Sequence, residues 1–372
     1  MYFCSRNLKE LFIWFVVMEV DILFLMPSTK PFLKDESIGT LILAKKAILA
    51  GYNVEILRYW EVLQELSDYE SFSIKMIDSV LKKNPKILSF YCRCSEYHIC
   101  LDIAGKIKNI NPSIKILFAG PQAEIVAQKT LEYFSFVDYI CCSEGENTIV
   151  PLLNSLIRNI EFKCNIPGLT YRNNGIIVQN TFPDLLPNNY VQEFNYYDLI
   201  PKQVILNSES TSIDVGRGCP FTCTFCSTKK FWKQMYRLRS IDDIIREITE
   251  IFSLYGIRRY CLDHDLFTAN HRNIKTFCQK LKEMSFTVEW YCSSRIDTIS
   301  EELIDVMKEA GCYKILYGIE SGSPKIQKMV NKNLNLDKCE KIIKYTLSKG
   351  ISVIASFMYG FPEETEDDFE QT

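Results

Sequence analysis

The sequence has little of what nucleic-acid-binding proteins, disordered tails and membrane anchors are made of. Its 43 Lys and Arg residues are outnumbered by 46 Asp and Glu residues, so no basic excess favours nucleic acid as a partner. No low-complexity tract or acidic tail predicts disorder. The one membrane-like run, Leu11 to Val17, is far shorter than the roughly 18 apolar residues that span a bilayer, and no small-residue cleavage site follows it. We therefore expect neither a membrane partner nor a signal peptide.

Histidine is also scarce, with only His98, His264 and His271, whereas cysteine is abundant, with 15 residues. Because no export signal is found, so many thiols indicate a reducing compartment, and we expect the protein in the cytoplasm. In that compartment clustered cysteines serve metals or catalysis more often than disulfides. Isolated cysteines in or beside apolar runs are expected to pack as small hydrophobic side chains, as at Cys141, Cys261 and Cys312.

The length of 372 residues predicts two or three domains, at about 150 residues each. Regular patterning begins only at Met18, so we interpret Met18 as the natural start and residues 1–17 as an extension. From there to about residue 160, short apolar runs such as VDILFLM, KILSFY and IKILFAG alternate with amphipathic helical patterns. This alternation predicts an α/β domain with five parallel strands and helices on both faces, in a flavodoxin-like (Rossmann-like) order.

In such a sheet, ligands bind beyond the carboxyl ends of the strands. The loops at those ends are small and polar, with the sequences MPST, YCR, GPQ and SEGE. They would let a large flat ligand approach the backbone, although simple tight turns explain them equally well. The candidate ligand-binding residues are Ser28, Thr29, Tyr91, Gly120, Gln122, Glu144, Gly145 and Glu146.

Residues 161–210 break this rhythm. Asn173, Asn174 and Gly175 predict a hairpin turn, and the Pro- and Asn-rich stretch after it is typical of a linker. In residues 211–372 strands and helices alternate again, and the strands tend to end in polar or glycine-rich segments, as in a TIM-like (β/α) barrel. Only five strands fit before Thr372, so we expect a partial barrel and a chain truncated at its C-terminus.

Three cysteines lie close together near the start of this second half, in the segment GRGCPFTCTFCSTKKFW. Cys219, Cys223 and Cys226 have the spacing C-x3-C-x2-C, directly after an expected strand. Thiolate ligands select iron–sulfur clusters, zinc or copper(I). A structural zinc site needs a fourth ligand, yet neither a second C-x2-C pair nor a histidine pair is present. A cubane cluster with one open iron fits three thiolates, while buried or zinc-binding cysteines remain the alternative.

This loop, including Phe225 before the last cysteine, resembles the cluster loop of the radical SAM superfamily. The resemblance implies a 4Fe-4S cluster whose open iron is chelated by S-adenosylmethionine (SAM), which is reductively cleaved to a 5'-deoxyadenosyl radical. The segments Gly318 to Gly322 and Asp263 to Phe267 are similar to the family's GxES and acidic second-strand segments. The SAM-binding residues that the resemblance implies are Glu320, Arg295, Phe225, Gly360 and Pro362.

The first half resembles the cobalamin-binding domain of one radical SAM subgroup, through Gly120-Pro121 and the SEGE segment after Val137-Asp138-Tyr139. The D-x-H-x-x-G motif, which supplies a cobalt-binding histidine in some cobalamin domains, is absent. His98 has Leu101 where that glycine would stand, and we expect it to be a surface or core residue. In the subgroup, cobalt is usually bound without histidine, and the resemblance implies cobalamin as a cofactor.

The resemblance implies an enzyme, with methyl transfer from methylcobalamin to an unactivated carbon of a small-molecule or peptide substrate as the leading hypothesis. Radical cyclisation or rearrangement is one alternative, and a noncatalytic cluster-binding module is another. A reducing partner such as flavodoxin or ferredoxin is implied. Basic and aromatic residues just after the cysteines could shield the cluster and guide such an anionic donor, although a solvated loop explains them as well: Lys229, Lys230, Trp232, Lys233 and Tyr236. No catalytic side chain is singled out.

Overall fold

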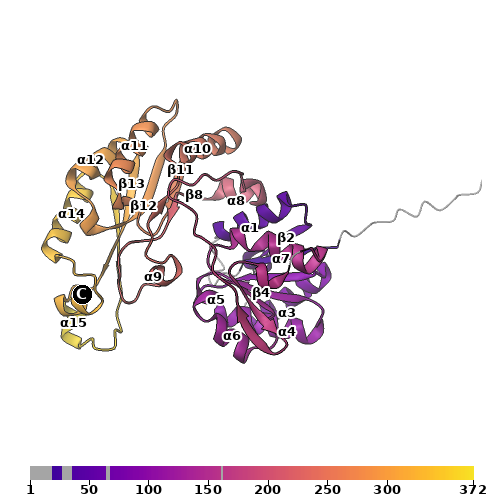
Figure 1. Cartoon of the computed structure of the whole chain (residues 1–372). Coiled ribbons are helices and arrows are strands. Elements are labelled where there is room, and N and C mark those ends of the chain that lie inside the picture. Colours follow the sequence, from indigo (N-terminus) through magenta and orange to yellow (C-terminus); the bar gives the residue numbers. More distant parts are fainter. Residues whose placement is uncertain (1–18, 27–35, 64–67, 161) are drawn as a thin grey trace, which may run out of the picture.

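The computed structural model describes residues 19–26, 36–63, 68–160 and 162–372, and it contains two α/β units, each with its own sheet (Figure 1). The expected extension, residues 1–17, lies outside the described residues, as do Met18, Ser28 and Thr29. Within the described ranges, no helix is long and apolar enough to cross a membrane.

The sheet of the first unit confirms the flavodoxin-like order. Its five parallel strands run in the order β2-β1-β3-β4-β5. Every residue of β1 is buried, as expected of a central strand with helices on both faces. The strands are β1 (Ile22–Met26), β2 (Val54–Arg58), β3 (Ile87–Tyr91), β4 (Lys115–Ala119) and β5 (Tyr139–Cys141).

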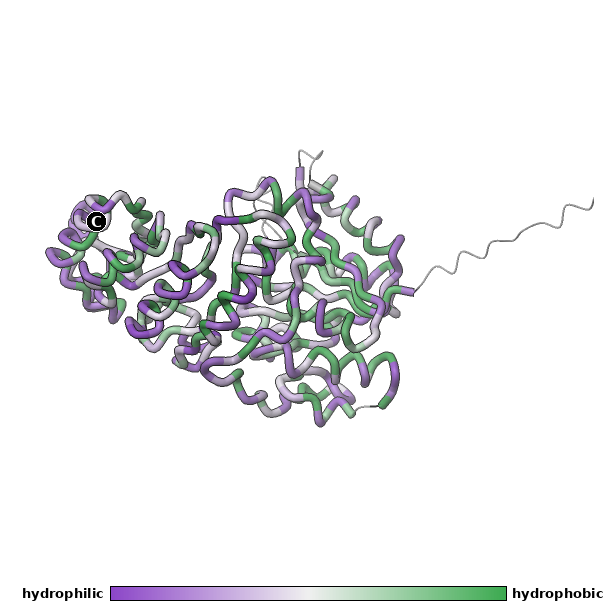
Figure 2. The backbone as a smooth tube through the Cα atoms, turned by 90° about the horizontal axis from the view of Figure 1, so that it is seen from above, coloured by the Kyte–Doolittle hydropathy of each residue, from purple (hydrophilic) through white to green (hydrophobic). Residues whose placement is uncertain are grey.

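Helices cover both faces of this sheet and form two hydrophobic cores. One core contains residues of α3 and α4, and the other contains residues of α1 and α7. Figure 2 shows the hydrophobic residues gathered in the interior of this unit, where the strands run. The helices are α1 (Ile38–Leu49), α2 (Tyr59–Leu63), α3 (Tyr69–Lys83), α4 (Tyr97–Ile110), α5 (Pro121–Ile125), α6 (Ala127–Tyr133) and α7 (Ile149–Leu153).

The hairpin expected at Asn174-Gly175 is present, but it extends the first sheet. Its strands, β6 (Leu169–Asn173) and β7 (Ile176–Gln179), continue the sheet antiparallel beyond β5. Both turn residues have positive φ, 50° and 83°, as a tight hairpin turn requires. The sequence pattern predicted the hairpin turn but did not indicate that the hairpin would pair with β5. The assignment of residues 161–210 to a separate hairpin and linker therefore stays a prediction.

The second unit contains five parallel strands that neighbour one another in chain order, which confirms the partial TIM-like barrel. The strands are β8 (Thr211–Asp214), β11 (Arg259–Asp263), β12 (Glu289–Arg295), β13 (Cys312–Glu320) and β14 (Ser352–Phe357). The longer helices between them are α10 (Ile241–Tyr255), α11 (His271–Lys282), α12 (Glu301–Glu309) and α14 (Leu336–Ser348). Shorter helices are α8 (Lys202–Asn207), α9 (Thr228–Phe231), α13 (Pro324–Met329) and α15 (Glu366–Glu370).

The two units share a hydrophobic contact. Leu41 and Ile42 of α1 belong to the same buried core as Ile213 and Val215 of the second unit. In Figure 1, β8 is the strand of the second sheet nearest to α1, and α9 lies on the side that faces the first unit. Loops at the carboxyl ends of the two sheets therefore meet between the units.

Candidate functional site

The cysteine loop is closed at its base by a two-stranded ribbon. The strands β9 (Gly216–Arg217) and β10 (Arg237–Leu238) pair antiparallel, and residues 218–236 form the loop between them. Gly218 has φ of 89°, and a Cβ there would lie 1.8 Å from the Met235 carbonyl oxygen. Its N–H donates to Asp265 Oδ2 at 2.8 Å. Only glycine therefore allows the two ends of the loop to approach this closely.

The three cysteines lie within eight residues of this loop. Cys223 is buried, whereas Cys219 and Cys226 are partly exposed. Burial raises the pKa of Cys219, and the nearby Cys226, Asp265 and Cys223 add to the rise. Within the described ranges, no three His, Cys, Asp or Glu side chains converge on a single ion. In a cubane cluster each thiolate binds a different iron, so this loop fits a cluster better than a lone zinc ion.

Arg295, at the end of β12, lies against the cysteine loop. Its Nη1 is 3.4 Å from Cys223 Sγ, and its guanidinium carbon is 4.1 Å from the centre of the Phe221 ring. Both oxygens of Asp297 accept from it, at 2.7 and 3.0 Å, and the Lys332 carbonyl accepts from Nη2. Arg295, which the sequence predicts to bind SAM, thus lies next to the loop that carries Cys223, with one donor directed at the loop and the others at Asp297 and Lys332.

Glu320, at the end of β13, forms a buried ion pair with Lys332. The Nζ of Lys332 donates to Glu320 Oε1 at 2.7 Å, and both side chains are at most 10% exposed. Glu320 has φ of 70° and sits where the pairing between β13 and β14 is irregular. A Cβ on Gly318 would lie 2.6 Å from Glu320 Oε1, so glycine at 318 makes room for this pair. Lys332 is a site residue that the sequence pattern did not indicate.

The remaining residues expected to bind SAM lie at the edge of the same region. The Phe225 ring is partly exposed, with its centre 6.4 Å from that of Phe361 and 6.0 Å from Lys332 Nζ. Gly360 has φ of 84°, and Glu364 accepts from its N–H, which closes the turn that precedes Pro362. Phe225 thus adjoins both the Glu320–Lys332 pair and the Gly360–Pro362 turn.

A cavity of about 310 Å³ lies between the carboxyl ends of the two sheets. From the first unit, five of the expected ligand-binding residues line it: Tyr91, Gly120, Glu144, Gly145 and Glu146. Gln122, also expected there, is not among its lining residues; it lies in α5, and its N–H donates to the Cys92 carbonyl. His98 is exposed on α4 and does not line the cavity, as expected of a surface histidine.

The opposite wall of the cavity comes from the second unit, which contributes Arg217, Trp232, His264 and Asp265 among others. Ser143 also lines the cavity, and its hydroxyl is buried without a hydrogen-bond partner among the described residues. A buried hydroxyl without a hydrogen-bond partner lowers the stability of the fold unless a ligand or a water molecule bonds to it. Ser143 is thus a candidate ligand contact.

His264 in this wall is held as a neutral ring. Its Nδ1 accepts from the Leu266 N–H at 2.8 Å, so the proton lies on Nε2, which donates to the Arg237 carbonyl at 3.1 Å. Burial lowers the pKa of His264 to about 4. The imidazole is therefore uncharged near neutral pH and braces β10 against β11.

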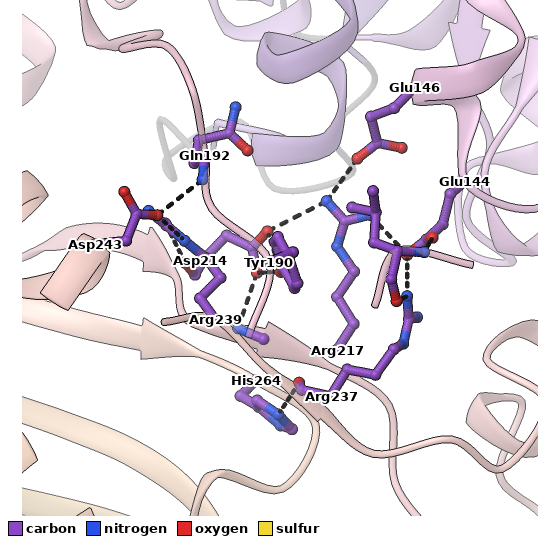
Figure 3. Close-up of polar contacts among 12 residues, drawn as sticks. Glu144, Glu146, Tyr190, Gln192, Asp214, Arg217, Arg237, Arg239, Asp243 and His264 are labelled. Carbon is purple, nitrogen blue, oxygen red and sulfur yellow. Dashed lines mark hydrogen bonds and ion pairs between the residues drawn. The ribbon is translucent and has the colours of Figure 1, made fainter. Parts of the chain in front are cut away.

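The carboxylates of Glu144 and Glu146 are engaged by arginines of the second unit (Figure 3). Glu144 pairs with both Arg217 and Arg237, and Glu146 pairs with Arg217. Burial opposes the charge on Arg217, yet Glu146, Asp214 and Glu144 together hold its pKa well above the usual range. These arginines flank the cysteine loop in the sequence, but their glutamate partners in the first unit lie at least 71 residues away, so no local pattern shows these pairs.

Comparison with known proteins agrees with this geometry. Residues 213–372 match the family model described as "Radical SAM superfamily". The second unit is a radical SAM domain. The recognition made from the cysteine loop is confirmed, and the domain begins inside β8, shortly before that loop.

Curated relatives of the radical SAM domain and its preceding unit include methyltransferases and cyclases. An uncharacterized methyltransferase of Pyrococcus horikoshii is 28% identical over 82% of this chain and 66% of its own length. The anaerobic magnesium-protoporphyrin IX monomethyl ester cyclase of Rubrivivax gelatinosus is 25% identical over 71% of this chain and 49% of its own length. The chain thus spans about half to two thirds of the length of these relatives.

Two solved structures share the fold across both units. The cobalamin-dependent SAM radical enzyme OxsB, with aqua-cobalamin and SAM bound, has a TM-score of 0.76 and 16% identity over 95% of this chain and 51% of its own. The radical SAM methyltransferase TsrM from Kitasatospora setae, with cobalamin and a 4Fe-4S cluster bound, has a TM-score of 0.74 and 14% identity over 94% of this chain and 68% of its own. The flavodoxin-like unit followed by a radical SAM domain is thus a known arrangement.

Proposed function

We propose that this protein is a radical SAM enzyme that binds a 4Fe-4S cluster through Cys219, Cys223 and Cys226 and cobalamin in its first unit, and that it methylates an unactivated carbon. When bound, the reduced cluster supplies the electron that cleaves SAM to a 5'-deoxyadenosyl radical, and methylcobalamin supplies the methyl group. The observation that carries the proposal is the cavity between the two sheets, because residues of the first unit and residues of the loop that carries the cysteines both line it.

The residues of the first unit fit a large flat ligand. Gly120 has φ of 96°, and a Cβ there would lie 3.0 Å from both the Cys92 carbonyl oxygen and the Tyr91 ring. The bare backbone at this turn leaves the cavity open, while the buried Ser143 hydroxyl is available to a polar group. Among the described residues that line the cavity, His264 is the only histidine, and both of its ring nitrogens are engaged, so we expect cobalt to be bound without histidine.

The residues around the cysteines fit SAM. Glu320 offers a buried carboxylate to an ammonium or ribose hydroxyl, and its partner Lys332 offers a positive charge to a carboxylate. Phe225 offers a partly exposed ring beside them. Arg295 lies against Cys223, where it would orient the loop beside bound SAM. Buried, paired groups of this kind are preorganised, so their side chains need not become ordered when a ligand binds.

Radical cyclisation without methyl transfer is the second candidate, because the relative from Rubrivivax gelatinosus is named as a cyclase. The substrate of either reaction is proposed to be a small molecule or a peptide. A noncatalytic cluster-binding module is disfavoured, because the buried Glu320–Lys332 pair has no evident purpose in a protein that only holds a cluster.

The test is metal content and SAM cleavage of the chain. The protein is purified without oxygen, reconstituted with iron, sulfide and hydroxocobalamin, and gel-filtered. We expect about four iron and about one cobalt atom per chain, and 5'-deoxyadenosine on addition of SAM and titanium(III) citrate. Iron without cobalt would overturn methyl transfer from cobalamin, and iron without SAM cleavage would favour the noncatalytic module.

An acidic electron donor such as flavodoxin or ferredoxin is proposed to dock beside α9. Lys229, Lys230 and Lys233 are exposed there, and none of them forms an ion pair within the described part of the chain. The first two follow Cys226 by three and four residues, so local positive charge lies next to the loop that would hold the cluster. Such charge speeds the encounter with a protein of opposite charge, and raising the salt concentration should weaken the effect.

A further inference from the structure

Glu144 is a buried carboxylate of the first unit that bonds both strands at the base of the cysteine loop. Its Oε1 accepts from Arg217 Nη1 at 3.0 Å and from Arg237 Nη1 at 2.7 Å. Its Oε2 accepts from the Leu186 N–H at 2.6 Å. The side chain of Glu144 is fully buried. Figure 3 shows the two guanidinium groups converging on this carboxylate from the second unit.

The two arginines belong to the ribbon that sets the position of the loop. Arg217 of β9 and Arg237 of β10 are directly paired partners, and Arg217 precedes Cys219 by two residues. Any displacement of Glu144 would therefore act on both ends of the loop at once. Both guanidinium carbons also lie near the centre of the Trp232 ring, at 5.7 and 5.4 Å, so the clamp extends to the loop itself.

The charge balance differs between the two arginines. Arg217 has two further carboxylates, Glu146 at 2.6 Å and Asp214 at 3.2 Å. Arg237 is fully buried and has Glu144 as its one carboxylate partner among the described residues. Its Nε and Nη2 have no hydrogen-bond partner there. A buried charge that depends on a single partner is strongly affected when that partner is neutralised, so Glu144 matters most for β10.

The segment that carries this carboxylate also lines the cavity between the two sheets. Glu144, Gly145 and Glu146 all line it, and Arg217 and Trp232 line the opposite wall. A ligand in the cavity would thus contact the segment that holds the base of the cysteine loop. Glu144, Arg217 and Arg237 are in contact, so they connect a ligand in the cavity with the position of the loop.

We propose that Glu144 is a positioning residue: through Arg217 and Arg237 it fixes the cysteine loop relative to the cavity of the first unit and couples the two sites. This inference rests on the proposed function for the identity of the two ligands, but the clamp itself does not. The role differs from the direct ligand contact expected for Glu144 from the sequence, because its carboxylate is occupied by the two arginines.

The first experiment needs no cofactor. Hydrogen–deuterium exchange of residues 216–238 is compared for the wild type, Glu144→Gln and the control Glu247→Gln. The control removes a buried carboxylate that pairs with Arg239 at 2.6 Å and does not contact β9 or the loop. We expect about tenfold faster exchange at both β9 and β10 in Glu144→Gln, and no such change in the control, since a charge-assisted bond contributes roughly that factor or more. Unchanged exchange in folded Glu144→Gln would overturn the clamp.

The second experiment tests the coupling. The reduced, reconstituted protein is examined by electron paramagnetic resonance with and without hydroxocobalamin, and iron and cobalt are measured in each sample. We expect cobalamin to change the cluster signal in the wild type and in Glu247→Gln, but not in Glu144→Gln with full iron content. An equal change in Glu144→Gln would overturn the coupling. A wild type without cobalt would overturn the proposed function and leave the exchange experiment as the test of the clamp.

A variant with a shorter acid keeps the proposal testable if Glu144→Gln does not fold. Glu144→Asp keeps the charge but withdraws it from the arginines by one methylene, so we expect exchange at β9 and β10 between that of the wild type and that of Glu144→Gln. If the amide variant does not fold, wild-type exchange in Glu144→Asp would overturn the clamp, and faster exchange confined to 216–238 would support it.

Discussion

The two sheets present different kinds of surface where their carboxyl ends meet, although Glu144 and Glu146 of the first unit also form ion pairs there. The edge of the first sheet includes a turn with bare backbone, at Gly120, and a buried hydroxyl, at Ser143, that has no hydrogen-bond partner among the residues the structure describes. The edge of the second sheet is crowded with paired charges, as at Arg295 with Asp297 and Glu320 with Lys332. The difference teaches that one edge is built to leave room and the other to hold side chains and a loop in fixed positions.

Removing one of the three loop cysteines should have the largest effect, because it should abolish the cluster at the second edge. We expect Cys223→Ala to lose its iron and all SAM cleavage while keeping its far-UV circular dichroism, because a cubane with two thiolates is not held. Cys164→Ala, which removes an exposed cysteine outside the loop, is the matched control and should keep its iron. Full iron content in Cys223→Ala would refute the assignment of the loop.

Breaking the buried pair of the second edge should have the next largest effect. Lys332→Met leaves Glu320 as an uncompensated buried charge, so we expect the free energy of unfolding to fall by about 3–5 kcal/mol in urea. Lys344→Met, which breaks an exposed pair with Glu340, should cost less than about 0.5 kcal/mol. Restoring stability with Lys332→Met and Glu320→Gln together would show that the charge is responsible; equal losses in the two lysine variants would argue against the pair.

Filling the open turn of the first edge should have a smaller effect on stability. Gly120 has φ of 96° and ψ of 174°, a region nearly restricted to glycine, so Gly120→Ala should cost about 1–3 kcal/mol. It should also reduce cobalt content without reducing iron, because the new methyl pushes on Tyr91 in the cavity wall. Gly39→Ala is the comparison, since a Cβ there meets nothing within 4 Å and helix α1 favours alanine. A parallel loss of iron in Gly120→Ala would contradict the separation of the two edges.

The pH dependence through His264 should be the smallest effect. Its folded pKa, about 4, lies below the unfolded value near 6.5, so the unfolded chain binds more protons between these values. Stability from this residue is therefore present above about pH 6.5 and declines as the pH falls toward 4, by about 1 kcal/mol at pH 5.5. Melting temperatures of the wild type and His264→Gln, measured from pH 7 to 5, should differ in slope. Equal slopes would mean that His264 is not held neutral.

Much of the fold could be predicted because it depends on local periodicity. The alternation of apolar runs with amphipathic helices predicted the parallel strands β1 to β5 and the strands that neighbour one another in chain order in the radical SAM domain. Asn174-Gly175 predicted the turn between β6 and β7. The spacing of Cys219, Cys223 and Cys226 indicated the cluster loop. Each of these signals lies within one element or one loop, and the physics of pleat, helix pitch and thiolate chemistry acts at that range.

The pairing of charged groups was decided only by tertiary structure. Glu144, Glu146 and Arg295, which the sequence predicts as ligand contacts, also bond to other residues of the chain, and Lys332 was not indicated at all. The partners Glu144 and Arg237 are 93 residues apart, and a charged residue carries no local sign of which opposite charge it will meet. Burial fixes that choice, because a charge removed from water must find whatever partner the packed units bring to it.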